Sequence, residues 1–194
     1  EQHMQQQERM ERKGIKVLSL FFIVRVANYT APDGMIKRIF DEEFEQIKGR
    51  SAFYAELSAE EVREAYFAEK KPKKGETSGE AIDTSSRTVE EREAERAAFE
   101  LIMRQKERLL SFEEKKCFIF AHSALKEGWD NPNVFQICTL NQTVSEIKKR
   151  QEIGRGLRLP VNQQGERVFD EEVNLLSVIA NESYQSYAAN LQSE

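Results

Sequence analysis

Histidine and cysteine are scarce in this sequence. Its 194 residues include two histidines, His3 and His122, and two cysteines, Cys117 and Cys138. The cysteines lie in separate apolar runs without a histidine pair nearby, which argues against both a zinc site and a disulfide framework. Two histidines that lie far apart in the sequence also provide too few ligands for a typical metal centre and argue against a serine triad. We therefore expect no metal ligands in this chain.

The sequence also lacks a long apolar run and an excess of positive charge. The longest apolar stretch, residues 17–24, is far shorter than a membrane-spanning helix requires. The polar N-terminus has no signal-peptide pattern, so we expect a cytoplasmic protein without membrane contact. A net charge of −5 argues against a surface that binds nucleic acid all over, although a local basic patch is compatible with it.

Strand and helix patterns alternate along the chain. Residues 17–24 form the continuous apolar run typical of a central parallel strand, and residues 117–121, 134–138 and 173–180 predict further strands. Apolar residues at spacings of three and four predict a helix after the turn at 31–34. Capping boxes starting at Ser58, Thr88 and Thr143 predict helices to about Phe67, Leu110 and Leu157. This alternation predicts an α/β fold with an open, mainly parallel sheet covered by helices on both faces.

The remaining segments are polar. Residues 2–13 are compatible with a helix but lack an apolar stripe, and residues 160–167 are typical of a loop entering a hairpin. Residues 69–87 are rich in Lys, Pro, Gly, Glu, Ser and Thr, which predicts a mobile insertion. Residues 182–191 predict a terminal helix. The whole chain, 1–194, is interpreted as one domain carrying this insertion.

A glycine-flanked pair of arginines is the first candidate site. On a helix, Gln151, Arg155 and Arg158 would project from one face, with Gly154 and Gly156 beside them. Glycine destabilises a helix interior, so these two glycines suggest a close approach to the backbone. Guanidinium groups suit phosphate oxygens, which makes the arginines a candidate phosphate clamp. A solvated basic face ending in a glycine cap is the alternative interpretation.

The second candidate site lies between two predicted strands. Gly128, Asp130 and Pro132 crowd a turn at a strand edge, where open parallel sheets place ligand-binding loops. Asp130 could accept hydrogen bonds from a ribose, or it could be a turn aspartate satisfied by nearby backbone amides. Trp129 is interpreted as a packing anchor.

Together the two segments resemble the fifth and sixth motifs of superfamily two helicases. The sixth motif has the form Gln-x-x-Gly-Arg-x-x-Arg, which residues 151–158 match at every fixed position. More narrowly, residues 14–23, 124–140, 146–160 and 177–184 are similar to the Res subunit of type III restriction enzymes. The resemblance spans nearly the whole chain and is weakest between Arg50 and Arg108.

The resemblance implies the second of two RecA-like domains, with ATP and Mg²⁺ bound mainly by the first. Arg158 would then be the arginine finger, with Arg155 beside it on the γ-phosphate, and Gln151 would couple nucleotide state to the cleft between the domains. Asp130, Gly128 and Gly154 would lie at the nucleotide. The resemblance also implies four partners: duplex DNA, the first RecA-like domain, a C-terminal nuclease domain and the methyltransferase subunit Mod.

Several parts of such a motor are absent from this sequence. It has no phosphate-binding loop and no acidic box for magnesium, so we expect this chain alone to be inactive. For DNA contact, His122 and Ser123 stand where the superfamily often has a threonine, and Asn28 with Tyr29 follows the first strand. Residues 148–150 form a basic cluster that could equally be a solvated helix face.

Two other functions are compatible with these motifs. One is a RecA-like module kept only for binding or scaffolding. The other is the second motor domain of a different superfamily two DNA repair helicase. Sequence upstream of Glu1 would distinguish the first alternative, because a motor needs a phosphate-loop lysine and an acidic box. The leading hypothesis is the second motor domain of a DNA translocase in a Res subunit.

Overall fold

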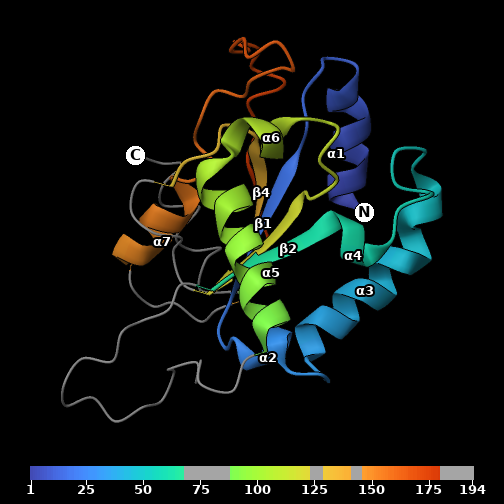
Figure 1. Cartoon of the computed structure of the whole chain (residues 1–194). Helices are drawn as coiled ribbons and strands as arrows, with labels where there is room; N and C mark the ends of the chain where they lie inside the picture. The colour runs from blue at the N-terminus through green and yellow to red at the C-terminus, as the bar shows by residue number, and fades with distance from the viewer. Residues whose placement is uncertain (68–87, 123–128, 141–145, 180–194) are drawn as a thin grey trace.

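A five-stranded sheet forms the centre of the computed structural model, which describes residues 1–67, 88–122, 129–140 and 146–179 (Figure 1). The strands lie in the order β2-β3-β1-β4-β5, and all four pairings are parallel. Their bounds are β1 Leu18–Ile23, β2 Arg63–Tyr66, β3 Phe118–His122, β4 Val134–Thr139 and β5 Ser177–Ile179. The predicted α/β class with an open parallel sheet is confirmed.

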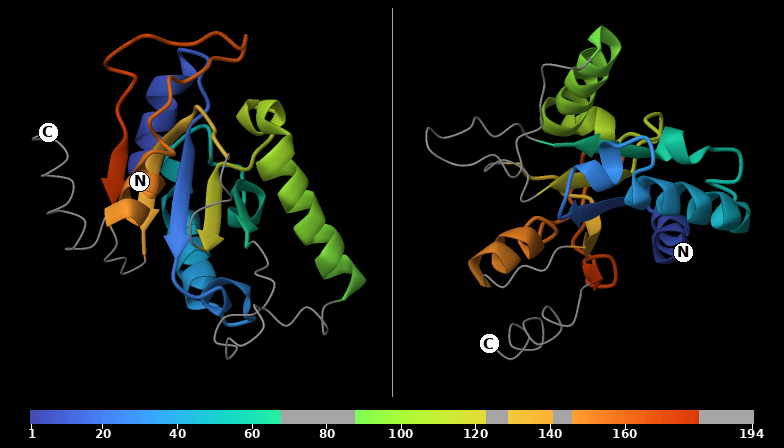
Figure 2. Two further views of the ribbon diagram at one scale, coloured as in Figure 1. Left: turned by 90° about the vertical axis from the view of Figure 1, so that its left-hand side faces the viewer. Right: turned by 90° about the horizontal axis from the view of Figure 1, so that it is seen from below.

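Helices lie on both faces of the sheet. Figure 2 shows α1 and α3 on one face and α7 on the other, while α5 and α6 lie beside the edge strand β2. The helical bounds are α1 Gln2–Glu11, α2 Ala27–Thr30, α3 Met35–Ile47, η1 Lys48–Arg50, α4 Ala59–Val62, α5 Val89–Phe99, η3 Glu100–Arg104, α6 Lys106–Leu110 and α7 Glu146–Ile153. Here η1 is a 3₁₀-helix and η3 is a π-helix.

The predicted central strand is confirmed, because β1 lies in the middle of the sheet and is buried on both faces. Leu18 and Leu20 point to one face and are at most 1% exposed. On the other face Phe21 stacks on Phe120 of β3, with ring centroids 4.7 Å apart, and meets Phe40 of α3 edge to face. This two-sided burial explains why β1 is apolar at successive positions and does not alternate.

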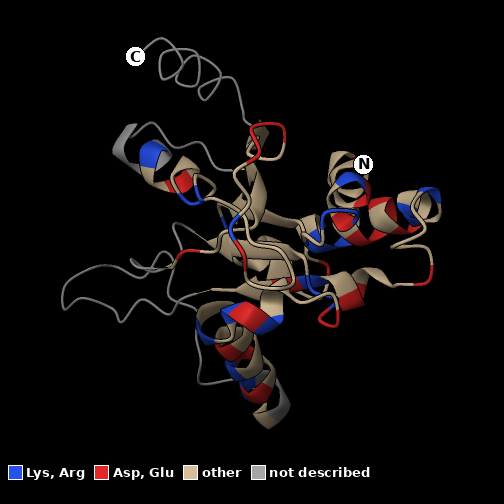
Figure 3. Cartoon of the chain, turned by 90° about the horizontal axis from the view of Figure 1, so that it is seen from above, with Lys and Arg blue, Asp and Glu red and all other residues tan. Residues whose placement is uncertain are grey.

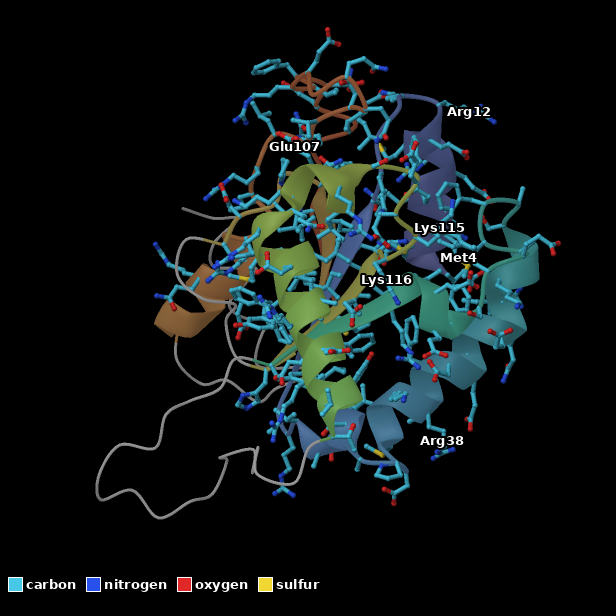
Figure 4. All side chains as sticks on the ribbon, in the orientation of Figure 1. Met4, Arg12, Arg38, Glu107, Lys115 and Lys116 are labelled. Atoms are coloured by element: carbon cyan, nitrogen blue, oxygen red, sulfur yellow. The ribbon has the colours of Figure 1, made fainter. Side chains whose placement is uncertain are left out.

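The N-terminal helix α1 packs on the sheet through polar side chains. Residues 2–13 lack an apolar stripe, yet His3, Met4, Gln6, Gln7 and Met10 are all buried, and Figure 4 labels Met4 on this helix. The Gln7 side-chain oxygen accepts from Val17 N at 2.7 Å, and its amide donates to the Ile15 oxygen at 3.2 Å. Gln7 therefore satisfies the backbone just before β1, which a hydrophobic pattern cannot reveal.

Three predicted elements differ from the structure. The capping box at Ser58 is present, but α4 ends at Val62 and residues 63–66 form β2. The chain becomes extended there because Arg63–Tyr66 pairs with β3. A helix at these residues would leave the backbone groups of β3 unpaired on that side. The predicted helix to Leu110 is interrupted at Gln105, between η3 and α6. The predicted strand at 173–180 is reduced to β5.

The loop expected at 160–167 does fold back as a hairpin. Val161 and Arg167 form an isolated antiparallel bridge, and Gly165 has a φ of 79°, which glycine adopts without strain. The predicted insertion at 69–87, the capping residue Thr143 and the terminal helix at 182–191 lie outside the described residues. Among the helices that are described, none has the length and apolarity to cross a bilayer.

Candidate nucleotide-facing site

The segment 129–133 leads into β4 at the amino end of the strand. The Asn133 oxygen accepts from Leu18 N at 2.8 Å, which fixes this segment beside the amino end of β1 as well. The sequence predicts a ligand loop around Asp130, which in open parallel sheets would lie at the carboxyl edge. Residues 129–133 lie instead at the amino edge, directly before β4, so this placement is wrong.

The two arginines lie after α7 and not on it. The helix ends at Ile153, with Gln151 exposed in its last turn. Beyond it the chain turns tightly, as Gly154 N donates to the Arg150 oxygen at 2.9 Å and Gly156 N to the Ile153 oxygen at 2.9 Å. The prediction that Gln151, Arg155 and Arg158 share one helical face is therefore wrong. The helix has given way to a turn before either arginine is reached.

The close approach predicted at the glycines is made by the chain itself. A Cβ atom on Gly156 would lie 2.4 Å from Leu176 Cδ1, so any side chain there would collide with Leu176. On Gly154, a Cβ atom would lie 3.0 Å from the Arg150 oxygen. The bare backbone at Gly156 thus serves the packing of residues 174–176 against the arginine segment.

Two buried asparagines fix the loop before β4, and one of them, Asn133, joins it to the segment after Arg158. Asn133 is fully buried; its amide donates to the Val161 oxygen at 2.9 Å, and its side-chain oxygen accepts from Val161 N at 2.8 Å. Asn131 is also fully buried and accepts from Asn133 N at 3.1 Å. Neither residue was predicted as part of the site. The available signal was that both asparagines flank a proline between two predicted strands, which is typical of a turn.

Arg155 is held by the backbone of the same loop. Its Nη1 donates to the Trp129 oxygen at 2.5 Å, and the Arg155 side chain is partly buried. Trp129 is 3% exposed, and its indole nitrogen donates to the Ile102 oxygen at 2.7 Å. The interpretation of Trp129 as a packing anchor is confirmed. Arg155 is connected through it to the helical segment at residues 100–104.

Asp130 forms an ion pair with Lys106, the first residue of α6. Its side chain is 50% exposed. The hydrogen bond from Lys106 lowers the pKa of Asp130, and the positive charge of Arg158 lowers it further. A partner on α6 is therefore the main contact of Asp130, where the sequence suggested backbone amides. No sequence pattern pointed to Lys106, because its contact depends on how two distant segments pack.

Arg158 is exposed at the rim of a hollow. Its Nη1 donates to the Leu157 oxygen at 3.2 Å, and none of the ion pairs within the described ranges includes it. The hollow has a volume of about 250 Å³ and combines Arg158 with apolar side chains, several of them exposed. It is lined by Pro132, Val134, Phe135, Gly156, Leu157, Arg158, Leu159, Pro160, Asn174, Leu175 and Leu176. An exposed cation beside an apolar hollow can receive an anionic group from a ligand or another domain.

The residues predicted to contact DNA lie at the opposite edge of the sheet. His122 ends β3 and pairs in register with Ile23, the last residue of β1, while Asn28 lies in α2 just beyond β1. Tyr29 is wrong as a DNA contact, because it is 6% exposed and accepts a hydrogen bond from Arg63. Ser123 and Gly128 lie outside the described residues. Two distinct surfaces therefore carry the candidates.

Neither the cysteines nor a metal cluster adds a reactive centre to this surface. Cys117 and Cys138 are both free and buried, and burial raises the pKa of their thiols to about 12 and about 11. Within the part of the chain that the structure describes, no group of three or more His, Cys, Asp or Glu could hold a metal ion. Charges of both signs alternate along the helices (Figure 3). The chemistry of the site rests on Arg155, Arg158 and Asp130.

The sequence of this chain is similar to the Res subunits of type III restriction-modification enzymes. The chain is 34% identical over 209 residues to the StyLTI Res subunit of Salmonella typhimurium, a type III restriction-modification enzyme, covering 93% of the chain and 19% of that protein. It is 35% identical over 181 residues to the EcoPI Res subunit of Escherichia phage P1, with coverages of 85% and 17%. It is 54% identical over 74 residues to the EcoP15I Res subunit of Escherichia coli, with coverages of 38% and 8%.

The chain is therefore a homologue of type III restriction enzyme Res subunits, and it spans less than a fifth of the length of the curated relatives it matches. No protein-family model matches it. A solved structure of the S. cerevisiae Dbp5 C-terminal domain bound to Gle1 and IP6 covers 99% of the chain and 77% of that domain, at 9% identity and a TM-score of 0.39. That likeness is weak, and the fold assignment rests on the strand pairing.

Proposed function

We propose that this chain is the second motor domain of an ATP-dependent DNA translocase within a type III Res subunit. The observation that carries the proposal is the position of Arg158, an exposed guanidinium beside Asp130 within the motif Gln151 to Arg158. The homology to Res subunits supports the same function. An exposed arginine at a domain surface is able to act on a phosphate bound by a neighbouring domain.

The described residues fit a nucleotide on that surface in different roles. Arg158 is exposed and would contact the γ-phosphate as the arginine finger. Arg155 donates an N–H to the Trp129 oxygen, so it would brace the loop and place its positive charge beside the γ-phosphate. Asp130 would lie toward the ribose, and Gln151 toward the cleft. Bound ATP with Mg²⁺ would supply the phosphoryl group whose transfer these side chains assist.

The sequence indicates which part of the nucleotide site this chain would supply and which part the first RecA-like domain would supply. It contains no phosphate-binding loop and no acidic box, so a first RecA-like domain would hold the phosphates and the Mg²⁺. The present chain would supply positive charge when the two domains close, because charge stabilisation across an interface requires both sides. We expect the 194-residue chain by itself to bind ATP weakly and to hydrolyse none.

The opposite edge of the sheet would face DNA. His122 and Asn28 lie there, beyond the ends of β3 and β1, and both carry groups that can donate to a backbone phosphate. Nucleotide and DNA would thus contact opposite ends of the same parallel strands, so closure at one edge would be transmitted to the other through the sheet. Partners in the complete enzyme would be a nuclease domain and the Mod subunit.

Replacement of Arg158 tests this proposal. In the intact Res subunit with Mod, R158A is expected to lower DNA-stimulated ATP hydrolysis by a factor of about 10³ or more, because arginine fingers contribute factors of this size. ATP and DNA binding should change little. R38A is the matched control, since Arg38 is exposed on α3 and pairs with Glu42. Unchanged ATPase activity in R158A would refute the motor role and favour a binding module.

A further inference from the structure

The helical segment that precedes β3 reaches across to the nucleotide-facing loop at two points. In the π-helix η3, Gln105 N donates to the Glu100 oxygen at 2.9 Å, which closes the helix. Carbonyl groups in the last turn of a helix have no N–H partner within it. The Ile102 oxygen is one of these, and it accepts from the Trp129 indole. The end of η3 thus anchors the loop by a buried hydrogen bond.

Lys106 makes the second connection. The backbone at Gln105 leaves helical geometry, with φ −97° and ψ 55°, and α6 begins with Lys106 in a new direction. Lys106 contacts the Asp130 carboxylate, whereas the next residue, Glu107, is exposed in the first turn of α6, where Figure 4 labels it. A π-helical turn is an irregularity often found at functional sites. Here the break at Gln105 directly precedes Lys106, which contacts Asp130.

Asp130 has two cations within electrostatic reach. Lys106 contacts it directly, and Arg158 lines the same hollow as Pro132, two residues from Asp130, where its charge also lowers the pKa of Asp130. Arginine binds carboxylates through two parallel hydrogen bonds, a geometry that lysine does not offer. A carboxylate without Lys106 would therefore have Arg158 as its best available partner. That pairing would engage the donors that Arg158 needs for a phosphate.

We propose that Lys106 is a positioning residue for the arginine finger, because it holds the Asp130 carboxylate and thereby keeps Arg158 available. This inference rests on the proposed motor function. It adds that Lys106 decides whether Arg158 pairs with Asp130 or stays available for a phosphate. Lys106 does not touch the nucleotide in this scheme; it acts through Asp130. The Lys106–Asp130 ion pair and the hydrogen bond from Trp129 to the Ile102 oxygen both hold this loop in place. The same loop provides the Trp129 oxygen that accepts from Arg155.

The experiment measures DNA-stimulated ATPase activity of the intact Res subunit with Mod as a function of ATP concentration. K106M should lower kcat on the order of tenfold, since small displacements of a catalytic group have effects of this size, with KM for ATP within about twofold of the parent. K106R should retain most of the activity. R104M is the matched control, because Arg104 lies two residues away, is exposed and pairs with Glu100.

A double-mutant cycle with D130N separates positioning from packing. In a D130N background, where a neutral amide replaces the carboxylate, K106M should cause no further loss of kcat. An equal loss in both backgrounds, no loss in K106M, or the same loss in R104M would overturn the inference. R158A in the same assay separates the two proposals. If R158A is inactive while K106M is unaffected, only the role of Lys106 fails; if R158A is fully active, the motor function itself fails.

Discussion

The ammonium group of Lys16 donates to the backbone oxygen of Leu109 at 2.8 Å and to that of Ser111 at 3.1 Å, and it also contacts the Glu114 oxygen. Lys16 is 1% exposed, and burial lowers its pKa to about 8. The three carbonyls belong to the end of α6 and the turn after it, so a single lysine before β1 closes the helical segment that contacts the candidate site.

Substitution K16M should destabilise the domain by about 2 to 4 kcal/mol, because buried carbonyl oxygens would lose their donor and each such loss costs roughly 1 to 3 kcal/mol. The measurement is urea unfolding of the 194-residue chain, followed by circular dichroism. K115M is the control, since Lys115 is exposed and donates to the Phe112 oxygen. Equal stability of K16M and K115M would contradict a structural role for the Lys16 contacts.

Substitution G156A should also destabilise the fold, by about 1 kcal/mol, the low end for overpacking, because the Leu176 side chain can shift into the hollow that both residues line. The added methyl group would lie 2.4 Å from Leu176 Cδ1, so Leu176 or the turn after α7 must shift. Thermal unfolding of G156A measures the effect, and the double variant G156A/L176A should recover part of the loss. G49A is the control, because a Cβ atom at Gly49 would meet nothing within 4 Å; a loss as large in G49A would rule out the clash.

Acid should destabilise the domain through His3. Its Nδ1 lies 2.7 Å from Ser19 Oγ and its Nε2 2.7 Å from Tyr54 OH, and burial lowers its pKa from 6.5 to about 3. Between these values the unfolded chain binds a proton that the folded chain does not, so stability is present above pH 6.5 and falls as the pH decreases. From pH 7 to pH 4.5 the loss from this group is about 3 kcal/mol.

Urea unfolding at several pH values measures this dependence, and the variant H3Q provides the comparison. Glutamine keeps a donor and an acceptor but does not titrate, so the stability of H3Q should decrease less between pH 7 and pH 4.5 than that of the parent. Carboxylates contribute equally to both proteins, and the difference between the two slopes isolates His3. Identical slopes would show that His3 does not remain neutral in the folded state.

Strands buried on both faces were the most predictable elements. The apolar run before Val24 and those beginning at Cys117 and Val134 identify β1, β3 and β4, because only a two-sided core accepts apolar residues at successive positions. The edge strand β2 was predicted as helix, since Arg63–Tyr66 has no run of this kind and follows the capping box at Ser58. Edge pairing is a tertiary event that local propensity does not record.

The residues of the candidate site could be predicted from the sequence, but their positions relative to one another could not. The motif from Gln151 to Arg158 and the segment around Asp130 were found by pattern, and the structure brings Arg155, Arg158 and Asp130 to one edge. The pattern placed both arginines on a helix that in fact ends at Ile153. Lys106 escaped prediction because an exposed lysine on a charged helix has no distinguishing neighbour in sequence.

The sequence by itself determined the α/β class, the central strand and the motif that relates this chain to Res subunits, since each depends on the order of residue types along the chain. Tertiary structure alone decided which edge of the sheet carries Asp130, which backbone oxygens bind Lys16 and Arg155, and which cation pairs with Asp130. The physical reason is that hydrogen bonds and ion pairs depend on distances across the fold, and these are set only when segments far apart in sequence pack together.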